Sequence, residues 1–189
     1  MKGMWLFLLG LVLGAVLVAI PKIAAHFRML ILGSSSGQGT ARVHTEEKFT
    51  FTAHASIAEV APLFGADKER VWSPGWNPKF LHPVPASDEE GMVFTVAHDH
   101  LRAAWVNTQF DLKNGRIQYV YVIPDALVTV ITIQLQPGGD QTQVEVAYDR
   151  TSLNAEADSH VHHMAEGDRN SGPEWEKQVN DYLASSRNH

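Results

Sequence analysis

Three histidines near the end of the chain are the first candidates for chemistry. His160, His162 and His163 fall within four positions of the stretch LNAEADSHVHHMAEGDRN. Imidazoles this close in sequence can bind a metal ion or titrate near neutral pH. On a helix, His160 and His163 would be neighbours, whereas His162 would point elsewhere. The zinc pattern His-Glu-x-x-His is absent. We therefore expect a solvated helix face and no metal.

Two alternatives for these histidines stay open. A pair of them could bind a metal ion together with His98 or His100 of the sequence HDH, although such a sequence is more often a polar turn. They could also make the protein sensitive to pH, because histidine titrates near neutrality.

Other residue types that carry out catalysis are scattered or missing. The chain has no cysteine, which excludes thiol nucleophiles and thiolate metal sites. The carboxylates Asp99, Asp111, Glu145 and Asp149 are expected on turns and exposed strand faces, and no two of them have a spacing that indicates acid–base work. The stretch GSSSGQGT (33–40) lacks the Gly-Lys-Ser/Thr ending of a phosphate-binding loop and the elbow of a serine hydrolase. The sequence predicts no catalytic residue and no cofactor.

Charge limits the partners. The formal net charge of the 189 residues is -6, and the 15 lysines and arginines are dispersed. Nucleic-acid binding needs clustered basic residues. We therefore expect no nucleic-acid partner.

Aromatic side chains are the remaining candidates for a site. They could line a cavity for an apolar ligand, with tyrosine hydroxyls to orient it, or they could simply fill the core. Val179 joins them because it shares the apolar stripe of the last helix. The candidate ligand-binding residues are Trp72, Trp76, Phe94, Trp105, Tyr119, Tyr121, Tyr148, Trp175 and Val179.

These residues would be positioned mainly by strands. Phe49 and Phe51 alternate with polar residues, which predicts a half-buried strand. A Ser56–Glu59 capping box and Gly65 bound a short helix, and Asp67 can cap a second one. Asn114-Gly115 is a hairpin signal. Further strands are expected at 91–98, 102–111, 115–123, 126–136 and 141–151.

The end of the chain is predicted to be helical. Asn154 can cap a first run with Ala157, Val161 and Met164 on its inner face. The stretch 167–173 interrupts it. Ser171 and Glu174 have the spacing of a second capping box. An amphipathic helix follows, with one stripe made of Trp175, Val179, Tyr182 and Leu183.

The first residues form a membrane-type segment. Residues 3–20 carry no charge, and as a helix they would span about 27 Å, enough for a bilayer core. We expect a single-pass membrane anchor. The alternative is a signal peptide cleaved near Ala25, which would give a secreted or periplasmic protein. The chain divides into an anchor or signal peptide (1–28), a linker (29–42) and one domain (43–187).

The order of elements resembles the helix-grip fold of the SRPBCC superfamily, which includes START domains, the birch-pollen-allergen group and bacterial polyketide cyclase-like proteins. The resemblance is carried by ERVWSPGWNP (69–78), GMVFTV (91–96), YDRTSLN (148–154) and EWEKQVNDYL (174–183), in that order. It implies an α+β domain in which a curved antiparallel sheet of about six to seven strands wraps around a C-terminal helix, in addition to the N-terminal membrane-type helix.

The resemblance also implies a function. Such domains commonly hold an apolar ligand between the sheet and the last helix, so the expected partner is a small hydrophobic molecule, lipid-like or aromatic. Trp175 is expected against the sheet near Tyr119 and Tyr121. A cyclase, dehydratase or hydrolase using the same cavity is the alternative, and an envelope factor that binds protein through its surface is a third. The superfamily has no shared catalytic residue to carry over. The oligomeric state stays open.

Overall fold

The computed structural model describes residues 41–98 and 101–187. The predicted anchor and nearly all of the linker lie outside these residues. Among the helices in this part of the chain, none has the length and apolarity needed to cross a bilayer.

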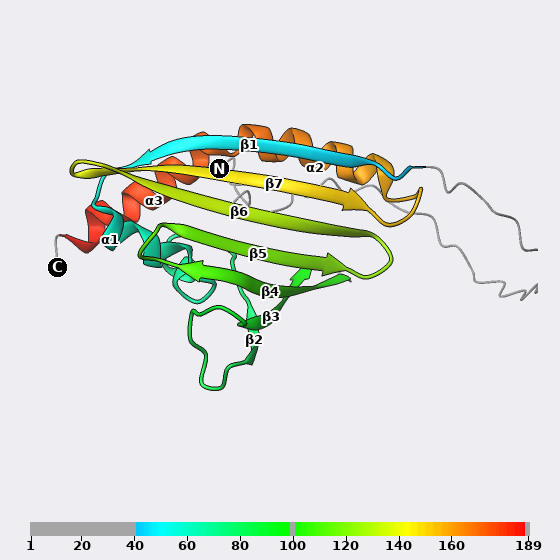
Figure 1. Cartoon of the computed structure of the whole chain (residues 1–189), viewed down its shortest axis with the longest axis horizontal. Coiled ribbons are helices and arrows are strands. Elements are labelled where there is room, and N and C mark those ends of the chain that lie inside the picture. Colours follow the sequence, from blue (N-terminus) through cyan, green and yellow to red (C-terminus); the bar gives the residue numbers. More distant parts are fainter. Residues whose placement is uncertain (1–40, 99–100, 188–189) are drawn as a thin grey trace, which may run out of the picture.

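One antiparallel sheet forms the centre of the domain (Figure 1). Its order is β1-β7-β6-β5-β4-β3-β2, so β1 joins the sheet beside the last strand and every other neighbour is a sequential hairpin partner. The strands are β1 (His44–Ala53), β2 (Lys79–His82), β3 (Val93–His98), β4 (Leu101–Asp111), β5 (Arg116–Ile123), β6 (Leu127–Gly138) and β7 (Gln141–Ser152).

Helices cover one face of this sheet. A short group follows β1 and consists of α1 (Ile57–Val60) and the 3-10 helices η1 (Ala61–Phe64) and η2 (Lys68–Val71). Two longer helices, α2 (Asp158–Asn170) and α3 (Gly172–Ser186), end the chain and pack along the sheet edge formed by β1 and β7 (Figure 1). The predicted α+β architecture is therefore confirmed. The sequence did not predict β2, which lies in the proline-rich stretch.

The strands bury alternate residues, as the sequence pattern predicted. On β5 the buried positions are Ile117, Tyr119, Tyr121 and Ile123, and on β6 every second residue from Leu127 to Leu135 is buried. This period of two places one row of side chains toward the helices. The hydrophobic core consequently lies between the inner face of the sheet and the helical layer.

The predicted break in the C-terminal helix is present, but it is shorter than predicted. α2 ends at Asn170 and α3 begins at Gly172, so only Ser171 separates them. Ser171 does not cap α3 through its side chain, because its Oγ donates back to the Gly167 carbonyl at 2.8 Å. The predicted Ser171–Glu174 capping box is therefore wrong. The other predicted box is present, with the Ser56 backbone N–H donating to the Glu59 carboxylate at 3.2 Å.

Candidate functional site

All nine residues predicted to line a ligand site are buried. Four of them gather around the indole of a fifth, Trp105, which stacks on Tyr121 with ring centroids 4.3 Å apart. The rings of Phe94, Trp76 and Tyr119 lie 5.5, 5.6 and 6.3 Å from it. This Trp105 cluster joins β3, β4 and β5 to the segment that follows η2.

Trp175 of α3 belongs to a different group of rings. Its ring lies 5.3 Å from Phe49, 5.4 Å from Trp72 and 6.3 Å from Phe64. These partners come from β1 and the short helices, not from β5. Trp175 thus packs against the sheet through Phe49 and Phe51 of β1, whereas Tyr119 and Tyr121 are ring neighbours of Trp105. Tyr119 and Trp175 share Phe64 as a neighbour, because the Tyr119 hydroxyl bonds the Phe64 carbonyl and the Phe64 ring stacks on Trp175. Tyr148 lies 6.3 Å from Phe49, and Val179 is fully buried.

Three aromatic polar atoms hold the covering segment in place. Trp72 Nε1 donates to the Leu63 carbonyl and Trp76 Nε1 to the Ala66 carbonyl, each at 2.7 Å. The Tyr119 hydroxyl donates to the Phe64 carbonyl at 2.9 Å. These hydrogen bonds satisfy carbonyls of a segment that has little regular structure. They also fix η1 and η2 over the inner face of β5.

A group of buried polar atoms beside the Trp105 cluster has no partner among the described residues. The atoms are Glu69 Oε1, Ser73 Oγ, Trp105 Nε1 and both amide atoms of Asn107. Trp105 and Asn107 are two positions apart on β4, and Asn107 faces Tyr119 across the β4–β5 pair. Against the effect of burial, the Asn107 amide lies close enough to the Tyr119 hydroxyl to lower its pKa, although the two groups do not meet in the geometry of an ordinary hydrogen bond. Glu69 and Ser73 are joined by a backbone hydrogen bond of 2.9 Å. We call Glu69, Ser73, Trp105 and Asn107 the unpaired polar group.

Glu69 has the most perturbed environment in this group. Burial raises the pKa of its carboxyl well above the usual range, and the nearby Asp88 raises it further. Burial is the main cause that raises the pKa of the Tyr119 hydroxyl, and the charge of Glu69 is the second. Burial also raises the pKa of Tyr148, and Glu69 adds to that rise. The carboxyl therefore points into the interior toward the inner face of the sheet. Its environment favours the uncharged acid.

Local structure explains how these residues come to face inward. The register of β4 and β5 shifts between Asn107 and Gln109, a bulge of the kind that re-aims side chains at functional sites. On the other wall, Asp88 accepts hydrogen bonds from the backbone N–H groups of Asp67 (2.8 Å) and Lys68 (3.2 Å) and so caps η2. A Cβ atom on Gly65 would lie 2.3 Å from Asp88 Oδ2, so a larger residue there would displace the Asp88 side chain. The predicted cap, Asp67, is replaced by Asp88.

A second buried polar cluster lies farther along the same face, and it is largely paired. Arg150 of β7 donates to Asp168 Oδ2 of α2 at 2.6 Å and to Thr129 Oγ1 at 2.9 Å. It also bonds the Tyr121 hydroxyl and lies 5.5 Å from the ring centre of Tyr148. Burial raises the pKa of Asp168, and Arg150 opposes that rise. This cluster ties α2 to the sheet.

Reasoning from the sequence missed the polar residues of both clusters. A signal for two of them was present, because the alternation that buries Ala103 and Trp105 continues to Asn107, and the alternation through Tyr148 continues to Arg150. A polar residue at an inward position of a strand is the sign to look for. Glu69 and Ser73 offered no such sign, because the segment 68–78 has no clear period.

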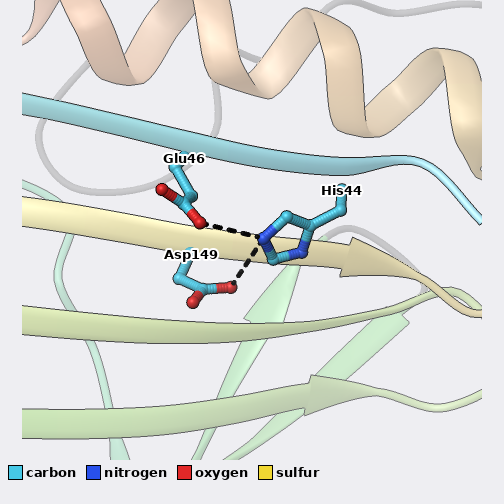
Figure 2. A group of neighbouring side chains, drawn as sticks. All are labelled: His44, Glu46 and Asp149. Carbon is cyan, nitrogen blue, oxygen red and sulfur yellow. Dashed lines mark hydrogen bonds and ion pairs between the residues drawn. The ribbon is translucent and has the colours of Figure 1, made fainter.

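The histidines of α2 lie on its solvent side, as expected. His160, His162 and His163 are exposed, whereas Val161 and Met164 are buried. Among the described residues, one other group could hold a metal ion, namely His44, Glu46 and Asp149. Figure 2 shows these side chains converging on the outside of β1 and β7, with His44 Nε2 3.4 Å from Glu46 Oε1 and 3.6 Å from Asp149 Oδ1. Thr151 Oγ1 lies 2.9 Å from the other ring nitrogen.

This exposed group is accounted for by its own charges. Glu46 and Asp149 are directly opposite each other in the β1–β7 pair. Like charges at such positions repel. The imidazole of His44 lies between the two carboxylates, within 3.6 Å of an oxygen of each, and separates them.

A surface pocket lies where the segment after η2 meets β2, β3 and the start of β4. It has a volume of about 260 Å³ and is lined by Gly75, Asn77, Lys79, Thr95, Val96, Ala97 and Arg102. Gly75 and Asn77 flank Trp76 in the chain, and Val96 lies two positions from Phe94 on the same strand face. Lys79, Thr95, Ala97 and Arg102 are exposed or half-buried and alternate with the buried row of these strands. The pocket therefore lies mainly on the solvent side of this part of the sheet, not between the sheet and α3.

Comparison with known proteins identifies the fold. No protein-family model matches the sequence, and no curated protein does either. Among solved structures, norcoclaurine synthase from Thalictrum flavum in complex with dopamine and hydroxybenzaldehyde is similar with a TM-score of 0.59 and 11% sequence identity, over 85% of this chain and 98% of that chain. Ara h 8.0201 is similar with a TM-score of 0.53 and 11% identity, over 76% of this chain and 99% of that one.

These two proteins have the SRPBCC, or helix-grip, fold. At 11% identity the likeness concerns the fold alone. The described domain is therefore a helix-grip domain, as its order of elements indicated.

Proposed function

We propose that this domain binds a small, mostly apolar ligand in its aromatic interior, between the inner face of the sheet and the helical layer. The observation that carries the proposal is the unpaired polar group: five buried atoms of four side chains without a hydrogen-bond partner among the described residues. More than about 90% of buried polar groups in proteins are hydrogen-bonded. Leaving one unsatisfied costs about 1–3 kcal/mol.

Five such atoms in one region indicate partners outside the described residues, and we assign these partners to a bound ligand. The surroundings indicate what those partners belong to. The walls are the rings of Trp76, Phe94, Trp105 and Tyr119, and burying apolar ligand surface against such walls is favourable by about 25 cal/mol per Å². A mostly apolar molecule with one polar end satisfies both features.

Extraction of the purified protein tests this proposal. The full-length protein would be washed, denatured and analysed for released small molecules by mass spectrometry, and then titrated with aromatic probes while tryptophan fluorescence is recorded. We expect a copurified apolar compound, or saturable probe binding that raises the melting temperature. A protein that releases nothing and binds none of the probes would refute ligand binding.

A second candidate function is acid–base catalysis in the same interior. The observation in its favour is Glu69, a buried carboxyl with a raised pKa that lies near Tyr119 of the inner sheet face. Perturbed acids of this kind are common at active sites. If the domain is an enzyme, Glu69→Gln should retain ligand binding and lose turnover of the copurified compound. Retained turnover in that variant would exclude Glu69 as the acid.

We also propose that residues 3–20 tether the domain to a membrane. The support is the uncharged apolar run in the sequence. Fractionation of cells that express the intact chain, followed by a mass measurement of the mature protein, tests it. A membrane-bound chain of full mass is expected. A soluble product that begins at His26 would show a cleaved signal peptide instead.

A further inference from the structure

The unpaired polar group offers donors and acceptors together. Trp105 Nε1 is a donor only, the Asn107 amide is both donor and acceptor, and a protonated Glu69 is also both. Trp105 and Asn107 are two positions apart on β4, which separates their Cα atoms by about 6.8 Å along the strand. A single polar group between them can therefore reach atoms of both. This polar group of the ligand must accept a hydrogen bond from the Trp105 indole N–H, and it must donate to or accept from the Asn107 amide.

The charges around this group limit what can bind. Asp88 is the one charged group that shifts the pKa of Glu69, and it raises it, so its influence is that of a negative charge. Arg150, a buried cation on this face of the sheet, is already bonded to Asp168, Thr129 and the Tyr121 hydroxyl, and its Nε lacks a partner among the described residues. A ligand carboxylate would lose its hydration and would meet a guanidinium whose charge is already shared with Asp168. A ligand ammonium would require Glu69 to ionise where burial opposes ionisation.

We propose that Trp105, Asn107 and Glu69 form a recognition site for an uncharged polar group, a carboxamide or phenol hydroxyl, on an aromatic ligand. This inference rests on the ligand-binding function proposed above and specifies the chemical class. The rings of Trp76, Phe94 and Tyr119 pack around the aromatic part of the ligand. Ser73 supplies a further hydroxyl at the same site. An uncharged group needs no burial of charge, which is why it fits this site better than an acid or an amine.

Four probes of nearly equal size test the class. Toluene, benzamide, benzoate and benzylamine would be titrated into the full-length protein at neutral pH by calorimetry. We expect benzamide to bind at least about tenfold more tightly than each of the other three. Asn107→Leu should remove that advantage, whereas Thr108→Val, a change at the exposed neighbour on the same strand, should leave it intact. Glu69→Gln should keep it, because glutamine is neutral and both donates and accepts.

The indole N–H resonances give a second measurement that needs no variant. Trp72 and Trp76 already donate to the Leu63 and Ala66 carbonyls, whereas Trp105 does not donate to any described residue. Benzamide should shift the nitrogen-15 and proton signals of Trp105 Nε1–H toward those of a hydrogen-bonded indole. The signals of Trp72 and Trp76 should move much less. A larger shift at either of those two would place the probe elsewhere.

The outcomes separate this inference from the function on which it rests. If toluene binds as tightly as benzamide and Asn107→Leu changes neither, the domain binds apolar ligands but has no polar recognition site. Tightest binding of benzylamine or benzoate would assign the site to charged ligands and overturn the inference. If none of the four probes binds and no indole signal shifts, both the inference and ligand binding in this interior fail.

Discussion

Two buried acids, Glu69 and Asp168, lie on the same face of one sheet and have opposite surroundings. Burial raises the pKa of both. Asp168 meets the guanidinium of Arg150 at 2.6 Å, and the pair joins α2 to β7. Glu69 Oε1 meets no partner among the described residues. Burial of an acid therefore does not distinguish a structural residue from a binding residue. The presence or absence of a partner within the chain does.

The largest expected effect is at the paired acid. Arg150→Met should destabilise the domain by about 3–5 kcal/mol, because it leaves the Asp168 carboxyl buried without its cation. The free energy of unfolding, measured in urea, checks this. The double variant Arg150→Met/Asp168→Leu should be more stable than the single one, since it removes both charges. A single variant that loses less than about 1 kcal/mol would contradict the structural role assigned to this pair.

A matched pair of core variants should separate the region around Trp175 from the unpaired polar group. Val179 is fully buried in α3, so Val179→Phe should overpack the core and cost about 1–3 kcal/mol. Asn107→Leu replaces an amide without partners by an apolar side chain of similar size, so it should be neutral or stabilising. Thermal unfolding of both variants makes the comparison. A stable Val179→Phe variant would indicate open space beside α3, where the sequence had suggested a cavity.

The pH dependence of stability should expose Glu69. Its pKa in the folded protein is raised above the unfolded value, so its stabilising contribution is complete below pH 4.5 and is lost as pH rises through the folded pKa. Glu69→Gln cannot ionise. The melting temperature of this variant relative to the parent should therefore increase steadily as pH rises from 4.5. A constant difference across that range would mean that Glu69 is not held in its protonated form.

The smallest effect is expected at the exposed histidines. Changing His160, His162 and His163 together to glutamine should alter the free energy of unfolding by no more than about 0.5 kcal/mol, as surface substitutions usually do. Elemental analysis of the parent protein should find no stoichiometric zinc or iron. One tightly held metal per chain that disappears in this variant would restore the metal hypothesis for α2. Loss in His44→Gln instead would assign the metal to the group in Figure 2.

The sheet could be predicted because the sequence patterns that indicate strands and hairpins extend over only a few neighbouring residues. Burial of every second residue leaves a period of two in the sequence, and Asn114-Gly115 marks a hairpin on its own. The short β2 was missed because prolines surround it and only Phe80 among its residues is partly buried. The second capping box was predicted from spacing alone, and the Ser171 hydroxyl bonds to Gly167 instead.

The site was predictable only in its apolar part. The nine predicted side chains are all buried, but their division into two ring clusters depends on which strand faces which helix. That arrangement is a property of the tertiary structure. Glu69 and Asp88 come together because the loop after β2 folds back and Asp88 caps η2. The hydrogen bond from the Asp67 backbone N–H to Asp88 joins residues that are 21 positions apart. No local pattern in the sequence records such a contact.

The position of β1 in the sheet has a consequence for how this chain is made. Among the strands of the described residues, β1 leaves the ribosome first, yet its one partner there is β7, and the bond between His44 and Thr151 spans 107 residues. Until β7 has been synthesised, Phe49 and Phe51 have no sheet to join. Contacts so distant in sequence form slowly, and an unpaired apolar strand is prone to aggregate while it waits. A nascent chain that stops before Ser152 should therefore be a substrate for chaperones, because its first strand lacks the neighbour that completes the fold.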